Sequence, residues 1–595
     1  APGTATAGHL VLNGGTLASS ADLTLNQNRG IALNGAGTLV TGAIPASSVL
    51  NINEFSNVSG GAVGGLVYTD GTGNDAVINN SGTVLATGSG ASQLVGTLDG
   101  DGLVAIAGAA GGPSGSGNAS VTNTVDGDVN ALRHGLVAYS TGGTASVTNA
   151  GEVTTQNGDG MSTALTILGV EVATTGAATG LNSGSLLAGD DGMVIVSING
   201  LADATNDADG VIEATENGII AYSTTNNAEA ENAGEVTATN GDGISTYDHI
   251  TNLLATGGTA TATNSGSITA GDDGMDIGAF GNASGTNLTG GVINATDVGI
   301  TVFSATGNAE GENQGELNAT NGNGITALAA LGNATGTNSG TMTVGGDGIA
   351  ATALVGDAAA SNLTGGVINA TGGGISANAL LGNATGTNEA EINATNGTGI
   401  SVNAPTGIAT ANNSGVVNAT NGAGVFALGA DGVAVNGGTG TVNSGGGGML
   451  GLILPGGTGN VEVTGGTTNS SDYGVIGVNL GDGNTTVTSE GKTSVTSGGL
   501  SAGVGGFSLN GTSTVNVNAD IDPPFLGAFS IAAGDADLNV ADGVTVEADG
   551  IGLLALSFGT GQADIEADGP GTTVQSLGTG VIGATLGGGD VYIDT

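Results

Sequence analysis

The sequence predicts an all-β protein, a right-handed parallel β-helix (β-solenoid) with about 25 residues in each coil. Three observations predict this fold. Gly provides 121 of the 595 residues, yet 38% of the chain is hydrophobic and only 2% is aromatic. Short alternations of apolar and polar residues lie between Gly and Asn, and an Asn returns at nearly constant spacing. Stacked strands pack small and β-branched side chains well, whereas helices tolerate this much Gly poorly.

The recurring Asn defines the coil. Each one is followed by a short apolar strand, a Gly with an aliphatic residue after it, and an Ala-rich strand. Successive Asn residues are 23 to 26 positions apart, with two longer steps of 32 and 33, and they are Asn123, Asn149, Asn182, Asn206, Asn232, Asn264, Asn287, Asn313, Asn338, Asn362, Asn388, Asn413 and Asn436. Coils too short for crossover helices must stack in parallel, and parallel crossovers are almost always right-handed.

Stacking in register would bring these amides together. We expect a structural ladder in which each side-chain amide bonds to the coils above and below. The alternative is that Asn only provides turn conformations with positive φ. The ladder is expected at Asn232, Asn264, Asn287, Asn313, Asn338, Asn362 and Asn388.

A longer repeat appears when coils three apart are compared. Val153, Val236, Leu317 and Ile392 are separated by 83, 81 and 75 residues. Met161, Ile244, Ile325 and Ile400 show the same three separations. The sequence therefore predicts a three-coil super-repeat, with equivalent aliphatic residues forming columns inside the solenoid.

Three regions differ in regularity. Residues 1–117 are predicted to form irregular coils, residues 118–440 Asn- and Gly-punctuated repeats, and residues 441–595 C-terminal coils in which the Asn punctuation fades. The two longer steps place extra residues around positions 167–172 and 247–253. We expect these to be insertions at coil tips that leave the stack intact.

The charge balance excludes several classes of partner. The net charge is −48 because only three residues are Lys or Arg, so we expect no nucleic-acid binding. No apolar run approaches the ~18 residues of a membrane span, so we expect no membrane insertion of this chain. Cys is absent, and the chain begins with Ala1 and Pro2 without Met, as removal of a secretory signal would leave it.

Two stretches carry a family resemblance. Residues 10–17 and 22–35, with Asn28-Arg29-Gly30-Ile31, resemble the β-strand repeat of bacterial autotransporter passengers. Central coils such as residues 264–275 are similar to the Asn-Ser-Gly repeats of the same passengers and of filamentous-haemagglutinin-like adhesins. The resemblance implies a secreted, extracellular protein on the outer surface of a Gram-negative bacterium, active in adhesion, aggregation or biofilm. No membrane barrel follows the repeats, so we expect that a barrel was removed or never belonged to the protein.

Candidate chemical groups are few. We expect no enzyme activity, because the Gly-Asp-Asp-Gly sequence recurs 82 residues later and a duplicated feature is more typical of a turn than of an active site. Arg133 and His134 are expected in an exposed turn. We expect no catalytic residue and no cofactor other than calcium, whose candidate oxygen ligands are Asp190, Asp191, Asp272, Asp273 and Asp347.

Three functions compete. The first is an adhesive surface protein that contacts a host or neighbouring cell through the insertion with Tyr247 and His249. The second is a self-associating subunit of an extracellular filament or surface layer, because a solenoid exposes unpaired strand edges at its ends. The most distant alternative is a polysaccharide-processing enzyme, for which the predicted flat, Thr- and Asn-rich exterior offers no unique cleft.

Overall fold

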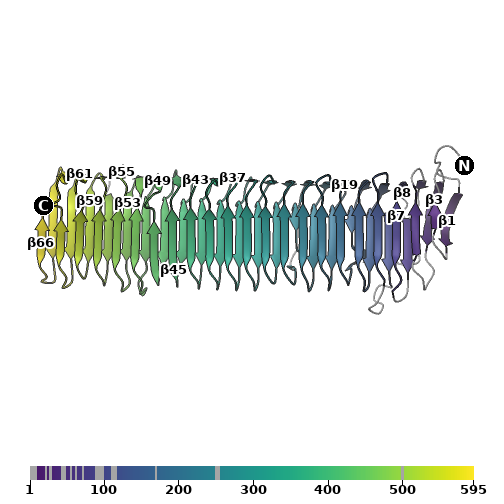
Figure 1. The fold of residues 1–595 in the computed structure, drawn as a ribbon, viewed down its shortest axis with the longest axis horizontal. Coiled ribbons are helices and arrows are strands. Elements are labelled where there is room, and N and C mark those ends of the chain that lie inside the picture. Colours follow the sequence, from purple (N-terminus) through teal and green to yellow (C-terminus); the bar gives the residue numbers. More distant parts are fainter. Residues whose placement is uncertain are drawn as a thin grey trace. The chain divides into compact units, whose positions relative to one another are not determined.

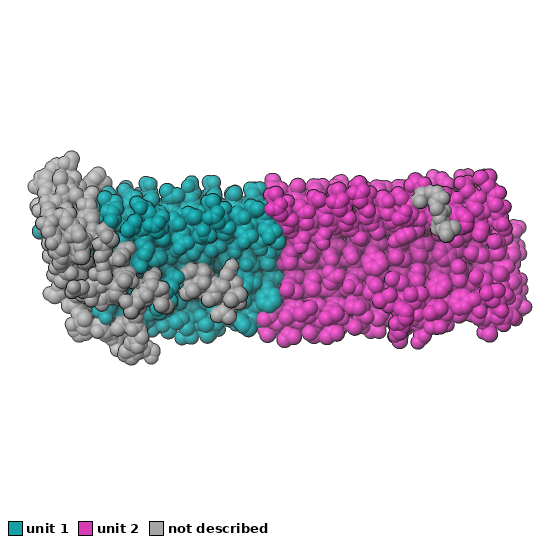
Figure 2. All heavy atoms as spheres, turned by 180° about the vertical axis from the view of Figure 1, so that it is seen from behind, with its two compact units in different colours: residues 1–303 teal, residues 304–595 magenta. Residues whose placement is uncertain are grey.

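The computed structural model describes residues 10–19, 23–25, 30–41, 48–53, 57–59, 63–69, 73–87, 100–108, 117–167, 170–247, 255–496 and 501–595. The chain divides into two compact units, residues 1–303 and 304–595, coloured separately in Figure 2. The described residues of both units form β-strands and turns, without any helix. It follows that they contain no helix long and apolar enough to cross a membrane.

A coil of unit 1 consists of three strands. In one such coil β10 (Ala119–Asn123) is followed by β11 (Asp128–Ala131) and β12 (Leu136–Ser140). Equivalent strands of the next coil are β13 (Ala145–Asn149), β14 (Glu152–Thr155) and β15 (Met161–Ser162). Each strand pairs in parallel with its equivalent, so that the strands form three stacks, which we name first, second and third in chain order.

Unit 2 repeats the same plan. Its β36 (Ala334–Asn338), β37 (Thr341–Val344) and β38 (Ile349–Ala353) pair in parallel with β39 (Ala358–Asn362), β40 (Val367–Ala370) and β41 (Ile375–Ala379). Figure 1 draws these strands as neighbouring arrows within each unit. In the described part of the chain the coils recur about every 26 residues, over about 19 turns. The predicted all-β solenoid of parallel coils is confirmed.

The core of each unit is a set of aliphatic columns. In unit 1, Met161, Met193, Ile219 and Ile244 are paired in register along the third stack and are fully buried. Columns of this kind form because strand side chains alternate between the two faces, and a stack without register shifts places equivalent residues above one another.

The Gly before each third-stack strand permits close stacking of the coils. A Cβ on Gly348 would lie 2.3 Å from Ile368 Cγ2 and 2.6 Å from the carbonyl oxygen of Gly374 in the next coil. Any side chain at position 348 would overlap the next coil, so this position requires Gly.

Asn436, the last of the recurring Asn residues, is one position out of step with the others, because it pairs in register with Asn412 and is exposed. The expectation about the insertions is wrong. The insertions do not leave from coil tips. Thr163 and Thr174, which flank the first, are joined by a hydrogen bond within the path of a third-stack strand, so the extra residues are extruded from the strand itself.

Candidate functional site

Polar side chains form a column along one corner of unit 1. The column occupies the position just before the Gly of each third-stack strand. In most of its members a side-chain atom accepts a hydrogen bond from the backbone N–H of the same position in a neighbouring coil. Asn217 Oδ1 accepts from Asp242 N at 2.9 Å, and Asp273 Oδ1 accepts from Val298 N at 2.9 Å. We name this set the tip column; its members are Asp101, His134, Asp159, Asp191, Asn217, Asp242 and Asp273.

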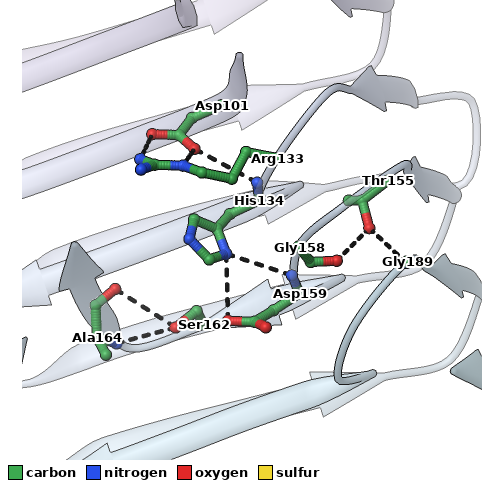
Figure 3. Close-up of polar contacts among 9 residues, drawn as sticks. All are labelled: Asp101, Arg133, His134, Thr155, Gly158, Asp159, Ser162, Ala164 and Gly189. Carbon is green, nitrogen blue, oxygen red and sulfur yellow. Dashed lines mark hydrogen bonds and ion pairs between the residues drawn. The ribbon is translucent and has the colours of Figure 1, made fainter. Parts of the chain in front are cut away.

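An ion-pair network lies at the N-terminal part of the tip column (Figure 3). Arg133 donates from Nε and Nη2 to the two carboxylate oxygens of Asp101 at 2.7 and 2.6 Å. The side chains of Arg133 and Asp101 are 21% and 1% exposed, and that of His134 is 14% exposed. The expectation of an exposed turn at Arg133 and His134 is therefore wrong, because neighbouring coils supply carboxylates that hold both side chains against the stack.

His134 faces two groups with opposite requirements. Its Nδ1 lies 3.2 Å from Asp159 N, which donates to it, and 3.2 Å from Asp159 Oδ2. A neutral Nδ1 can accept from the amide, whereas a protonated Nδ1 can only donate to the carboxylate. Among the described residues, Asp159 Oδ2 is buried without a hydrogen-bond partner.

The charges around His134 favour its protonated form. Burial by itself lowers the pKa of His134, but the carboxylates of Asp159 and Asp101 outweigh it, and the net pKa is raised. Burial also raises the pKa of Asp190, helped by the negative charges of Asp159 and Glu216. The neighbouring carboxylates therefore favour the protonated imidazole.

The calcium candidates take different places. Asp191 Oδ1 accepts from the backbone and side-chain nitrogens of Asn217 at 2.8 and 3.0 Å, and Asp347 Oδ1 accepts from Gly373 N at 2.6 Å. In the described residues the metal-compatible group consists of Asp272, Asp273 and Asp297, whose oxygens lie within 4.8 Å of one another. Those carboxylates are hard oxygen ligands of the type calcium prefers, and Asp190 is not among them.

Two carboxyl groups beside this acidic group, those of Asp276 and Asp242, have raised pKa values. Burial, with the charges of Asp273 and Asp272, raises the pKa of Asp276 to about 7. Burial and the charges of Asp276, Asp273 and Asp272 raise the pKa of Asp242 well above its usual value. A cation or an added proton would relieve this repulsion.

Each insertion begins and ends at a pair of buried Thr residues that sequence reasoning missed. Thr174 Oγ1 donates to Thr163 O at 2.7 Å, and Thr256 Oγ1 donates to Thr246 O at 3.0 Å. The Thr246 hydroxyl also exchanges hydrogen bonds with Gly278 N and O of a neighbouring coil. These hydroxyl groups form hydrogen bonds at the point where the inserted backbone leaves the strand. In the sequence, the only sign of this arrangement is a Thr on each side of the insertion.

The first insertion covers apolar surface. It forms an antiparallel hairpin, β16 (Ala164–Ile167) with β17 (Val170–Ala173). Its Leu165 packs in a buried cluster with Val137 and Tyr139, which point outward from the third stack. The hairpin therefore provides a second, smaller core outside the coils.

The second insertion contains the predicted partner contact. Tyr247 is half-buried and pairs with Ala255, and its ring lies over Gly278, where a Cβ would be 2.3 Å from Cζ. Burial and the charge of Asp276 raise the Tyr247 pKa. His249 lies outside the described residues. The Tyr247 ring is thus directed against its own stack.

The recurring Asn residues form buried amide ladders. Nδ2 of each donates to Oδ1 of the next, for example from Asn232 to Asn264 and from Asn264 to Asn287, both at 2.8 Å. In unit 2 the bonds are 2.9 to 3.0 Å long and join Asn313, Asn338, Asn362, Asn388 and Asn413 in order. Each Nδ2 also donates to backbone carbonyls, so the amide joins coils and closes its own turn.

The chain matches no family model, no curated protein and no solved structure.

Proposed function

We propose that this protein is a structural or adhesive protein displayed on the outer surface of a bacterial cell. The observation that carries the proposal is a row of exposed aliphatic side chains on unit 2. Leu331, Leu380 and Leu381 are 57%, 53% and 59% exposed, although most aliphatic residues of the unit are buried. A contiguous apolar patch on a soluble surface is typical of an interaction site.

The row results from the stacking. Leu354 N donates to Ala329 O, and Leu380 N donates to Ala353 O, which places the turns after three successive third-stack strands in register. These turns, residues 330–333, 354–357 and 380–383, contain a single carboxylate, Asp357. In a chain of net charge −48, such a weakly charged strip is where another surface can approach with little repulsion.

Attachment assays test this function. Cells or beads displaying the chain would be compared with the variant Leu331→Asn, Leu380→Asn, Leu381→Asn. The matched control is Thr326→Asn, Thr352→Asn, Ser376→Asn, at outward, half-buried positions of the same coils. We expect the leucine variant to lose most attachment and aggregation while the control keeps it. Equal attachment by both variants would show that the row of exposed leucines does not mediate attachment.

A filament or surface-layer subunit is the second candidate. The observation that favours it is β66 (Val591–Asp594), where Val591 and Ile593 are 43% and 48% exposed although they continue the buried column of Ala563 and Ile565. A further coil, from continued chain or from a second copy, would bury them. Electron microscopy of purified protein should show filaments that Ile593→Asp abolishes; monodisperse particles at high concentration would exclude this candidate.

A further inference from the structure

A second amide ladder lies on the outside of unit 2. It follows the second stack and is formed by outward-pointing Asn residues one position before the end of each strand. Nδ2 of each donates to Oδ1 of the preceding one at 2.8 to 2.9 Å, and the members are Asn369, Asn393, Asn418, Asn443 and Asn469. Unlike the buried ladders, these side chains are half-buried or exposed.

Part of this ladder borders a groove. The groove has a volume of about 340 Å³ and is lined by Asn418, Asn443 and Asn469 together with Ala419, Thr420, Ser444, Gly445, Ser470 and Thr496. This volume is near the lower end of ligand pockets, roughly 300–1,000 Å³. Gly445 lies in register with Thr420 of the preceding coil, and a Cβ at this Gly would overlap the Thr420 carbonyl oxygen.

The polar groups of the groove are held in fixed orientations. Ser444 Oγ donates to Gly447 O at 2.8 Å, and Ser470 Oγ donates to Tyr473 O at 2.7 Å. Within the groove, Asn418 and Asn443 each use one N–H and one lone pair on neighbouring ladder amides. An amide has two N–H groups and two oxygen lone pairs, so one donor and one acceptor remain on each. Successive coils therefore present alternating donors and acceptors about 4.8 Å apart.

We propose that this groove binds an uncharged, extended polysaccharide. Sugar hydroxyls both donate and accept, as the remaining amide groups require. An extended β-linked glucan places successive hexoses at a spacing close to that of the coils. The groove lining carries no ionisable side chain, and the net charge of −48 disfavours uronic-acid polymers. This binding site is independent of the leucine row.

Two pairs of variants test the site. Asn443→Leu removes amide groups inside the groove, and Asn393→Leu removes an equivalent member of the same ladder outside it. Thr420→Arg fills the groove, and Thr395→Arg places the same side chain at the equivalent exposed position one coil earlier. Thr420→Arg leaves the ladder intact, so it remains informative if Asn443→Leu perturbs the fold. Circular dichroism and thermal unfolding would verify that all four variants keep the stack.

Binding would be measured by calorimetry or NMR on the full chain with cellohexaose, maltohexaose and a galacturonic acid hexamer. We expect cellohexaose to bind with a Kd of about 1 mM or tighter, since a shallow groove buries few atoms. Asn443→Leu and Thr420→Arg should weaken it at least about tenfold, and the two controls less than about twofold. No cellohexaose binding at 10 mM, equal losses in groove and control variants, or tighter binding of the galacturonic hexamer would overturn the proposal. Attachment by the leucine row is unaffected by any of these outcomes.

Discussion

Replacement of Asn362 in the buried ladder should cost several kcal/mol. The side chain is fully buried, accepts from Asn338 Nδ2 at 2.9 Å, and donates to Asn388 Oδ1 at 3.0 Å. Asn362→Ala leaves two neighbouring amides each short of one bond. A buried polar group that loses its partner costs about 1–3 kcal/mol, which gives about 2–6 kcal/mol for the two together.

The isosteric change Asn362→Asp separates hydrogen bonding from volume. A carboxylate still accepts from Asn338, but it has no proton for Asn388 Oδ1 or for the carbonyls of Gly366 and Glu391, which Asn362 Nδ2 also contacts. Burial and these oxygens should raise the pKa of the new Asp above the usual value of about 3.9. The loss should therefore be greatest at pH 7 and shrink as the pH falls and the carboxyl becomes a donor.

Hydrogen exchange measured on peptides from residues 334–394 reports the local free energy of opening. The control is Asn378→Asp, because Asn378 points outward on β41 and bonds to the Ser376 hydroxyl at 2.9 Å. We expect the control to change the opening free energy by less than about 1 kcal/mol. Equal effects of the two Asp variants, or an Asn362→Asp effect that does not diminish on acidification, would refute the reasoning.

Three further predictions concern other parts of the molecule. His134 has a raised pKa in the fold, so its stabilising effect is complete below its unfolded pKa of about 6.5 and is lost as the pH rises through the higher folded value. Exchange protection of residues 128–161 should decline across that range, and His134→Asn should remove the decline. A decline that is unchanged in this variant would show that other groups cause it. Gly348→Ala should cost more than about 2 kcal/mol in thermal or denaturant unfolding, because its Cβ would overlap the next coil. Gly580→Ala, at the equivalent position with nothing within 4 Å, should cost less than about 0.5 kcal/mol, and similar costs would contradict the steric explanation. Leu165→Asn should expose the apolar cluster around Tyr139 and increase binding of a hydrophobic dye while far-ultraviolet circular dichroism stays constant. Unchanged dye binding would indicate that the hairpin is not the cover.

The sequence by itself determined the coil and its core. The repeating Asn, Gly and aliphatic residues predict parallel stacking, because only a stack in register can bury Ile325 and Ile400 at equivalent positions with so few large side chains. The same periodicity predicts that Asn232, Asn264 and Asn287 occupy equivalent positions in successive coils. The composition fixed the negative charge, and hence the classes of partner that the protein disfavours.

Only the tertiary structure decided what each coil places beside its neighbours. Asp101 and Arg133 are 32 residues apart and His134 and Asp159 are 25 apart, and spacing alone did not reveal that these side chains pair across coils. A slip of one residue separated Asn436 from the buried ladder and turned it outward, because strand side chains alternate between faces. The groove beside Asn443 is likewise lined by side chains from several coils. The repeat pattern of a single coil therefore does not predict it.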